Sequence, residues 1–221
     1  MDREAVHNEM ERARLTFSDL VRQAAPADMR RRSSGTRWTN RQLLFHMVFG
    51  YLIVRALMPL VHGFGHLPAS WSSRFAATLD AGRRPFHLIN YLGSCGGGQV
   101  LPRPATTALM DRTIRILQRK LASETEQSFA LTMHFPTSWD PYFRDTMRVF
   151  DVYHYGTQHF DHHRRQLTLC PNYASDTDST NGCAKRAPMP RWQKKALRRS
   201  ELSISSPSLS SCSPPTSASK Q

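Results

Sequence analysis

Histidines are concentrated in one short stretch, since four of the ten in the chain stand at positions 154, 159, 162 and 163. On a helix, residues four apart lie on one face with their Cβ atoms about 5–6 Å apart. His159 and His163 could therefore hold one metal ion through imidazole nitrogens. His162 is also within reach of His159, so the spacing alone leaves 162 and 163 open as alternatives. Because Phe160 follows His159, the HExxH pattern is absent and no general base accompanies the pair.

A metal site of this kind needs a third protein ligand, which must come from elsewhere in the chain. His46 is the best candidate, because it stands in the apolar run from residue 43 to 61. An ionisable side chain in such surroundings costs free energy unless it has a partner. The simpler alternative is that these histidines are hydrogen-bonded core residues, since pairs four apart also arise by chance.

The run 43–61 is almost long enough to cross a bilayer. Arg55 lies in the middle of it, however, and an arginine at mid-span costs about 2.5–3.5 kcal/mol on insertion scales. His46 and Pro59 interrupt it further. A helix buried at the centre of a helical bundle explains the run better than a membrane span.

Four long helices are predicted, over residues 2–23, 39–61, 102–127 and 142–169. The first and third carry apolar stripes at helical spacing, at Met10, Ala13, Phe17, Leu20, Val21 and Ala24, and at Met110, Ile114, Leu117 and Leu121. Thr39 and Gln42 match a capping box at the start of the second helix. Pro59 could kink that helix, and Gly63 and Gly65 are expected to end it. The fold class is therefore all-α, a four-helix bundle.

The segments between these helices are less regular. An irregular or short-helical insert is expected over residues 66–101, with one short helix opening near Pro68 and a flexible glycine-rich turn at 94–98. Residues 134–141 are predicted to form a loop in which Trp139 is a packing anchor. Gly156, inside the last helix, indicates a place where another helix or a ligand approaches closely.

The composition changes after Cys170. Residues 171–221 are rich in Ser, Pro and Lys and too poor in apolar residues to form a core. We expect a helical domain over residues 1–170 and a disordered tail over 171–221.

The chain carries a net charge of +13, which attracts anions of any kind but says nothing about fold. Its four cysteines form no CxxC pair, so neither a zinc ribbon nor a thioredoxin-type site is indicated. The polar start, from Met1 onward, has no signal-peptide pattern. We therefore expect a cytoplasmic protein without a membrane span.

Two sequence motifs resemble those of the DinB-like superfamily of metalloenzymes. These are Trp38-Thr39 followed by His46 on the second long helix, and His-x-x-x-His-Arg-x-Gln, here residues 159–166, on the last. The resemblance covers roughly residues 1–170. It implies a four-helix bundle in which His46, His159 and His163 bind a metal and His162 is a neighbour. The family often has Gly between the Arg and the Gln, where this chain has Arg165.

The resemblance implies a metal-dependent enzyme that activates a low-molecular-weight thiol, such as mycothiol, for transfer to an electrophilic substrate. Zinc is the expected ion, and nickel, iron or copper also accept three imidazoles. The catalytic residues stay unknown. His162, Arg164 and Arg165 are candidates for supporting the site or binding an anion, although the two arginines are more simply explained as exposed charges at a helix end.

Two alternatives remain open. The first is a non-catalytic bundle that uses the metal for stability or sensing. The second is a binder of nucleic acid or an anionic surface, although no nucleic-acid motif supports it. Small-molecule partners are expected, nucleic acid is not, and the chain could form a homodimer.

Overall fold

The computed structural model describes residues 2–169 and is helical for most of that length. The elements in order are α1 (Arg3–Gln23), α2 (Pro26–Arg30), α3 (Asn40–Gly65), α4 (Ala69–Ala81), α5 (Arg83–Val100), α6 (Arg103–Ser123), α7 (Glu126–Ala130), β1 (Thr132–His134), β2 (Thr146–Arg148) and α8 (Val149–Arg164). The strands form one antiparallel pair with Met133 opposite Met147. The predicted all-α fold is confirmed. The predicted tail, residues 171–221, lies outside the described residues.

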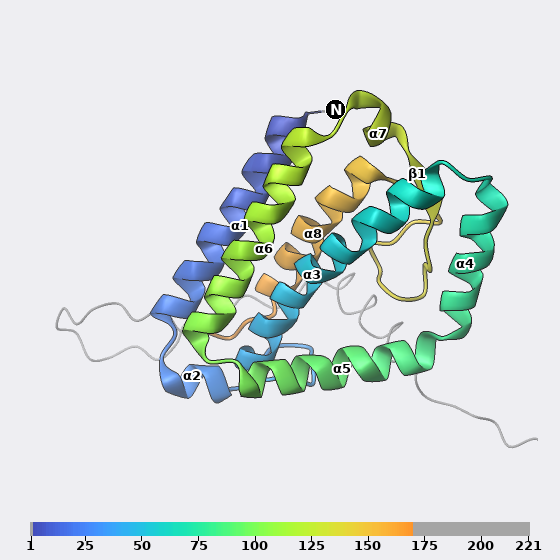
Figure 1. Cartoon of the computed structure of the whole chain (residues 1–221). Coiled ribbons are helices and arrows are strands. Elements are labelled where there is room, and N and C mark those ends of the chain that lie inside the picture. The colour runs from blue at the N-terminus through green and yellow to red at the C-terminus, as the bar shows by residue number, and fades with distance from the viewer. Residues whose placement is uncertain (1, 170–221) are drawn as a thin grey trace, which may run out of the picture. The chain divides into compact units, whose positions relative to one another are not determined.

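The four helices α1, α3, α6 and α8 form the bundle (Figure 1). Helices α1 and α6 lie side by side, α3 packs against α6 and α8, and α8 packs against α1. The apolar stripes predicted for α1 and α6 face the core, as Phe17 and Ile114, both fully buried, illustrate. Because each helix covers the apolar face of two others, the bundle buries a continuous core.

Helix α3 begins where the sequence predicts. Thr39 Oγ1 accepts the Gln42 N–H and Gln42 Oε1 accepts the Thr39 N–H, which completes the capping box. The helix continues through Pro59 beyond the expected last residue, 61, and ends at Gly65, one of the two glycines expected to end it. Pro59 lies on the exposed side, as does Arg55, whose carbonyl loses its helical partner there. Water can bond that carbonyl, so the proline does not stop the helix.

In the described part of the chain, α3 alone is long and apolar enough to pass a test for a membrane span. That test rests on length and composition only, and 56% of the most apolar window of α3 is buried inside the protein. Helix α3 contacts α5, α6 and α8. Its position agrees with the predicted helix at the centre of a bundle.

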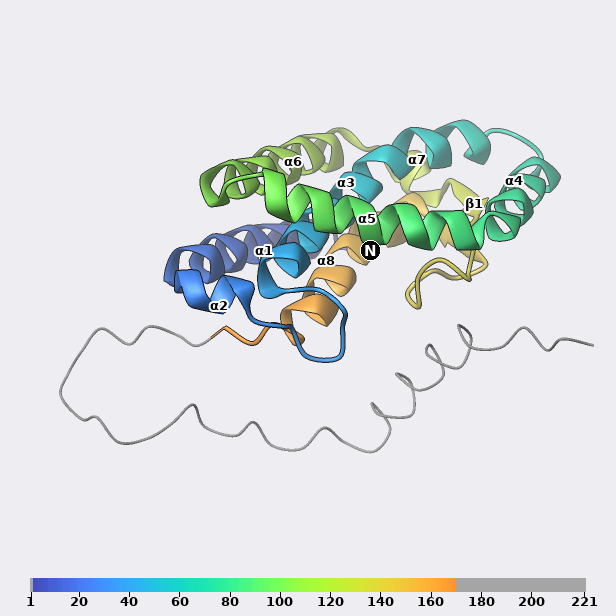
Figure 2. The same cartoon turned by 90° about the horizontal axis from the view of Figure 1, so that it is seen from below.

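The insert is more regular than predicted. It consists of two helices, α4 and α5, and α5 crosses one end of the bundle (Figure 2). The turn expected at 94–98 is wrong, because these residues are helical. A Cβ at Gly97 would lie 2.2 Å from the Phe45 ring, and one at Gly98 would lie 2.7 Å from the Gln42 Cα. The glycines therefore allow α5 to pack closely on α3.

The last helix begins at Val149, seven residues later than predicted. Residues 146–148 form β2 instead, so that only part of the expected helical run is helix. Gly156 behaves as expected, because a Cβ there would lie 2.8 Å from the Tyr51 ring of α3. The close approach of α3 and α8 at this point brings the start of α3 beside the end of α8.

Candidate metal centre

Three histidines from two helices meet where the start of α3 lies beside the end of α8. One ring nitrogen each from His46, His159 and His163 lies within 4.8 Å of the other two. The ring centroids are 4.5–5.0 Å apart. His46 and His159 are each only 4% exposed. The structure thus brings together the three histidines that the family resemblance implies.

His162, the alternative that the spacing left open, does not join this cluster. Its Nδ1 lies 3.1 Å from the Tyr142 hydroxyl, and its Nε2 lies 3.4 Å from the Gln166 side-chain amide nitrogen. Both ring nitrogens therefore have protein partners. His162 is a neighbour of the cluster through its ring contact with His163.

Hydrogen bonds at Nδ1 orient two of the three rings. The Ser94 hydroxyl donates to the Asn90 carbonyl at 2.8 Å, so that its oxygen accepts the His46 Nδ1–H at 3.0 Å. Likewise the His163 Nδ1–H donates to Gln166 Oε1 at 2.7 Å. Each bond fixes the tautomer whose Nε2 carries a lone pair, which is how metal-binding histidines are generally held. Within residues 2–169, these two Nε2 atoms have no hydrogen-bond partner.

His159 is positioned by packing rather than by a hydrogen bond. Its Nδ1 is buried without a partner among the described residues. A Cβ at Gly50 would lie 2.3 Å from that nitrogen, so the ring lies directly against the α3 backbone. Its Nε2 is on the side of Asp140, 4.0 Å from Oδ2. Trp38 covers the cluster from another side, with its ring centroid 4.3 Å from that of His46.

The cluster is neutral at ordinary pH. Burial, followed by the influence of His162, lowers the pKa of His159 to about 3. Burial and the neighbouring rings lower the pKa of His46 and of His163 well below the usual value. A metal ion binds the neutral imidazole, so these rings need not lose a proton before they bind one. Three convergent imidazole nitrogens suit zinc, nickel or iron, and they fit the ion that the family resemblance implies.

Asp140 is a residue near the cluster that the sequence analysis missed. It follows Trp139, whose predicted role as an anchor agrees with the structure: the Trp139 ring stacks on Phe86 at 3.6 Å, and its Nε1 donates to the Leu79 carbonyl. Burial raises the pKa of the Asp140 carboxyl, although hydrogen bonds from the Tyr142 N–H and the Tyr155 hydroxyl oppose that shift. One acidic residue in a loop gives no periodic signal that could have identified it.

The two arginines at the end of α8 are exposed. Arg164 forms an ion pair with Asp161, three residues before it, at 3.7 Å. Burial, followed by the charge of Arg165, lowers the pKa of His162. A role for these residues in binding an anion stays a prediction.

Comparison with known proteins gives one result that identifies the chain. No curated protein and no solved structure matches it. The family model of the DinB superfamily matches residues 9–167, a range that includes all three histidines and both sequence motifs. The match covers well over half of the 221 residues. Together with the helical bundle, it shows that the chain belongs to the DinB superfamily.

Proposed function

We propose that this protein is a metal-dependent enzyme that activates a low-molecular-weight thiol for transfer to an electrophilic substrate. The observation that carries the proposal is the triad of neutral, mostly buried histidines whose ring nitrogens converge within 4.8 Å. A divalent ion held there would lower the pKa of a bound thiol and so supply a thiolate nucleophile. Zinc is the proposed ion, and a mycothiol-like molecule is the proposed thiol.

The residues of the chain have separate tasks in this proposal. His46, His159 and His163 would hold the ion, and Ser94 and Gln166 keep two of the rings in the right tautomer. In the transfer, the thiol sulfur bonds to an electrophilic carbon while the leaving group departs with its bonding electrons. The thiol proton passes to solvent.

The metal part of the proposal is tested by metal analysis of the purified full chain. Wild type should contain about one equivalent of a transition metal after reconstitution with zinc or nickel. A His159→Ala/His163→Ala variant should contain none. His154→Ala is the matched control, because His154 lies on the same helix but pairs with Glu9. Equal metal in wild type and the double variant, or none in either, would refute the metal site.

The enzyme part is tested separately with metal-loaded protein. Wild type is mixed with mycothiol, bacillithiol or glutathione and a panel of electrophiles, and thioether formation is followed by mass spectrometry. His46→Ala should abolish turnover. If loaded wild type turns over none of the thiols, while His46→Ala lowers thermal stability in the presence of metal, the ion is structural and the enzyme part is wrong.

A further inference from the structure

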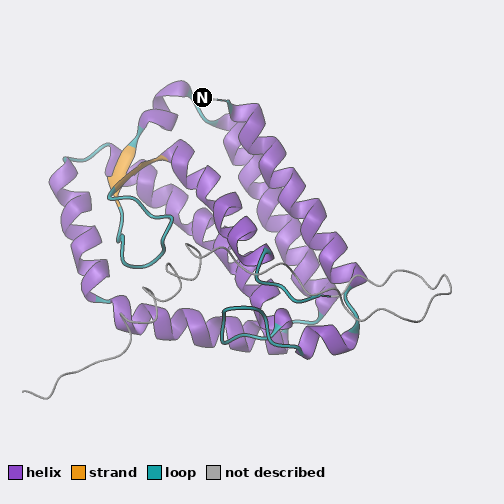
Figure 3. Ribbon diagram, turned by 180° about the vertical axis from the view of Figure 1, so that it is seen from behind, coloured by secondary structure: helices purple, strands orange, loops and turns teal. Residues whose placement is uncertain are grey.

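The carboxylate of Asp140, a loop residue, lies beside the histidine triad. Its Oδ2 is 4.0 Å from His159 Nε2, and the side chain is only 16% exposed. The residue belongs to the segment between β1 and β2, which Figure 3 shows as a loop that leaves one strand and returns to the other. A buried carboxylate beside a histidine is costly unless its charge is compensated.

Several contacts hold Asp140 in this position. Oδ1 accepts the Tyr142 N–H at 2.9 Å, and Oδ2 accepts the Tyr155 hydroxyl at 3.0 Å. Tyr155 lies on α8 one turn before His159, so the bond connects the loop to the helix that carries two of the three histidines. On the preceding side, Ser138 bonds to Asp80 of α4. The loop is thus fixed at both sides of the carboxylate.

Charge explains why a carboxylate would be retained here. Three neutral imidazoles give a divalent cation no negative charge, whereas a carboxylate gives one. In the described residues, Asp140 forms the one acidic contact within 4.0 Å of a triad histidine. The hydrogen bonds from Tyr142 and Tyr155 offset only part of the cost of its burial, and a cation beside the triad would offset more.

We propose that Asp140 is the carboxylate member of the metal centre and sets its affinity for divalent cations. The inference rests on the metal-binding part of the proposed function and does not depend on the thiol chemistry. Asp140 acts through its charge next to the ion, in a position that Tyr155 maintains. Groups that support a metal site in this way typically change its metal affinity by about 10–100-fold.

The test is the zinc affinity of the metal-free full chain, measured by competition with a chromophoric chelator. Asp140→Asn removes the charge but keeps the size of the side chain, and it should weaken zinc binding by about 10–100-fold. Asp145→Asn is the matched control, because Asp145 lies in the same loop with its side chain 82% exposed, and its affinity should equal that of wild type. Equal affinity for wild type and Asp140→Asn would overturn the proposal.

A second variant keeps the test decisive if Asp140→Asn does not fold. Tyr155→Phe removes the hydroxyl that holds Asp140 and leaves the ring in place, so it should weaken zinc binding in the same direction by a smaller factor. Unchanged affinity would overturn the role of Asp140. The outcomes also separate the two proposals. If His159→Ala/His163→Ala abolishes zinc binding and the Asp140 and Tyr155 variants do not change it, the proposed histidine site stands and only the role of Asp140 is rejected.

Discussion

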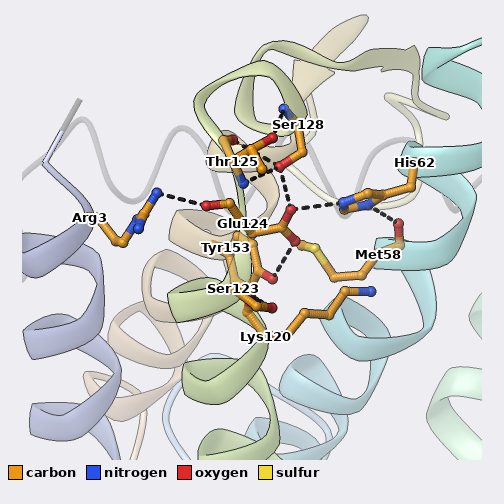
Figure 4. A network of polar contacts seen from close by, with 9 residues as sticks. All are labelled: Arg3, Met58, His62, Lys120, Ser123, Glu124, Thr125, Ser128 and Tyr153. Atoms are coloured by element: carbon orange, nitrogen blue, oxygen red, sulfur yellow. Dashed lines mark hydrogen bonds and ion pairs between the residues drawn. The ribbon is translucent and has the colours of Figure 1, made fainter.

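The pair of helices α3 and α8 carries a histidine and carboxylate cluster at each end, and the two clusters differ in how fully their polar atoms are bonded. At one end, His46 packs against His159, and His159 lies near Asp140. At the other, His62 and Tyr153 contact Glu124, as Figure 4 shows. His46 and His62 are sixteen residues apart on α3, about 24 Å along the helix axis.

The Glu124 cluster is closed. Its carboxylate accepts hydrogen bonds from His62 Nε2 at 2.9 Å, the Tyr153 hydroxyl at 3.0 Å and the Ser128 hydroxyl at 2.6 Å. His62 Nδ1 is bonded to the Met58 carbonyl. Every ring nitrogen and carboxylate oxygen in this cluster therefore has a partner inside the protein. Such a network stabilises the fold and leaves nothing with which to bind a ligand.

The triad is open by contrast. Ser94 and Gln166 bond the Nδ1 atoms of His46 and His163, and His159 packs on Gly50. One nitrogen of each ring lies within 4.8 Å of the other two, and the Nε2 atoms of His46 and His163 accept no hydrogen bond from the described residues. Similar residue types thus serve different purposes at the two ends. What separates a structural cluster from a candidate ligand site is where the unpaired atoms point.

Removal of the Glu124 carboxylate should give the largest effect on stability and none on metal binding. Glu124→Ala leaves His62 and Tyr153 without their buried acceptor, so the free energy of unfolding should fall by about 3 kcal/mol. Urea denaturation of the metal-free chain measures this loss. Glu126→Ala is the control, since the side chain of Glu126 is 88% exposed and its ion pair with Arg3 contributes little. A loss of zinc affinity in Glu124→Ala would show that the two ends are coupled and would contradict the separation of a structural cluster from a metal-binding one.

The sequence predicted the open cluster better than the closed one. Histidines four apart on one helix face give a periodic signal, and a lone His46 in an apolar run stands out against its neighbours. Asp140 lies in a loop, and Glu124 is the residue that ends α6 within a longer predicted helix, so no apolar periodicity indicates where either side chain points. Their partners are distant in the sequence, as the contact between Asp140 and His159 illustrates, and only the folded chain brings them together.

The glycines at 96–98 led to a wrong prediction, because a turn was expected where the chain forms helix α5. Cys95-Gly96-Gly97-Gly98 has the composition of a turn, and glycine weakens an isolated helix by about 1 kcal/mol per residue relative to alanine. In the fold, the missing side chains let α5 lie on Phe45 and Gln42. Tertiary packing therefore outweighs local preference here, and it places Ser94 beside His46.

Acid should destabilise the open cluster at a higher pH than the closed one. The pKa of His159 falls from about 6.5 in the unfolded chain to about 3 in the fold, so the unfolded state binds more protons between these values and stability is lost as the pH falls. At pH 5 the loss from His159 alone should be about 2 kcal/mol relative to neutral pH. Urea denaturation of metal-free protein from pH 7 to 5 measures it.

Glu124 responds in a lower range. Burial alone would raise its pKa, but hydrogen bonds from Ser128, His62 and Tyr153 outweigh burial and lower the pKa below the usual 4.5. Its contribution is therefore fully present above the unfolded pKa and is lost as the pH falls through the lowered folded pKa. His159→Gln in the metal-free chain should flatten the decline between pH 7 and 5, whereas Glu124→Gln should not. An unchanged slope in His159→Gln would contradict the assignment.

The smallest expected effect isolates the support behind a single ring. Ser94→Ala removes the acceptor for His46 Nδ1–H, so the ring loses its fixed tautomer and zinc affinity should fall about tenfold, or about 1.4 kcal/mol. Ser72→Ala is the matched control, because Ser72 is also a buried helical serine bonded to a carbonyl of its own helix, at Ala69, but has no hydrogen bond to a histidine within residues 2–169. Chelator competition should show the loss in Ser94→Ala alone. Equal zinc affinity in the two variants would mean that packing against Trp38 suffices to orient His46. The triad would then depend less on hydrogen bonds within the protein than the Glu124 cluster does.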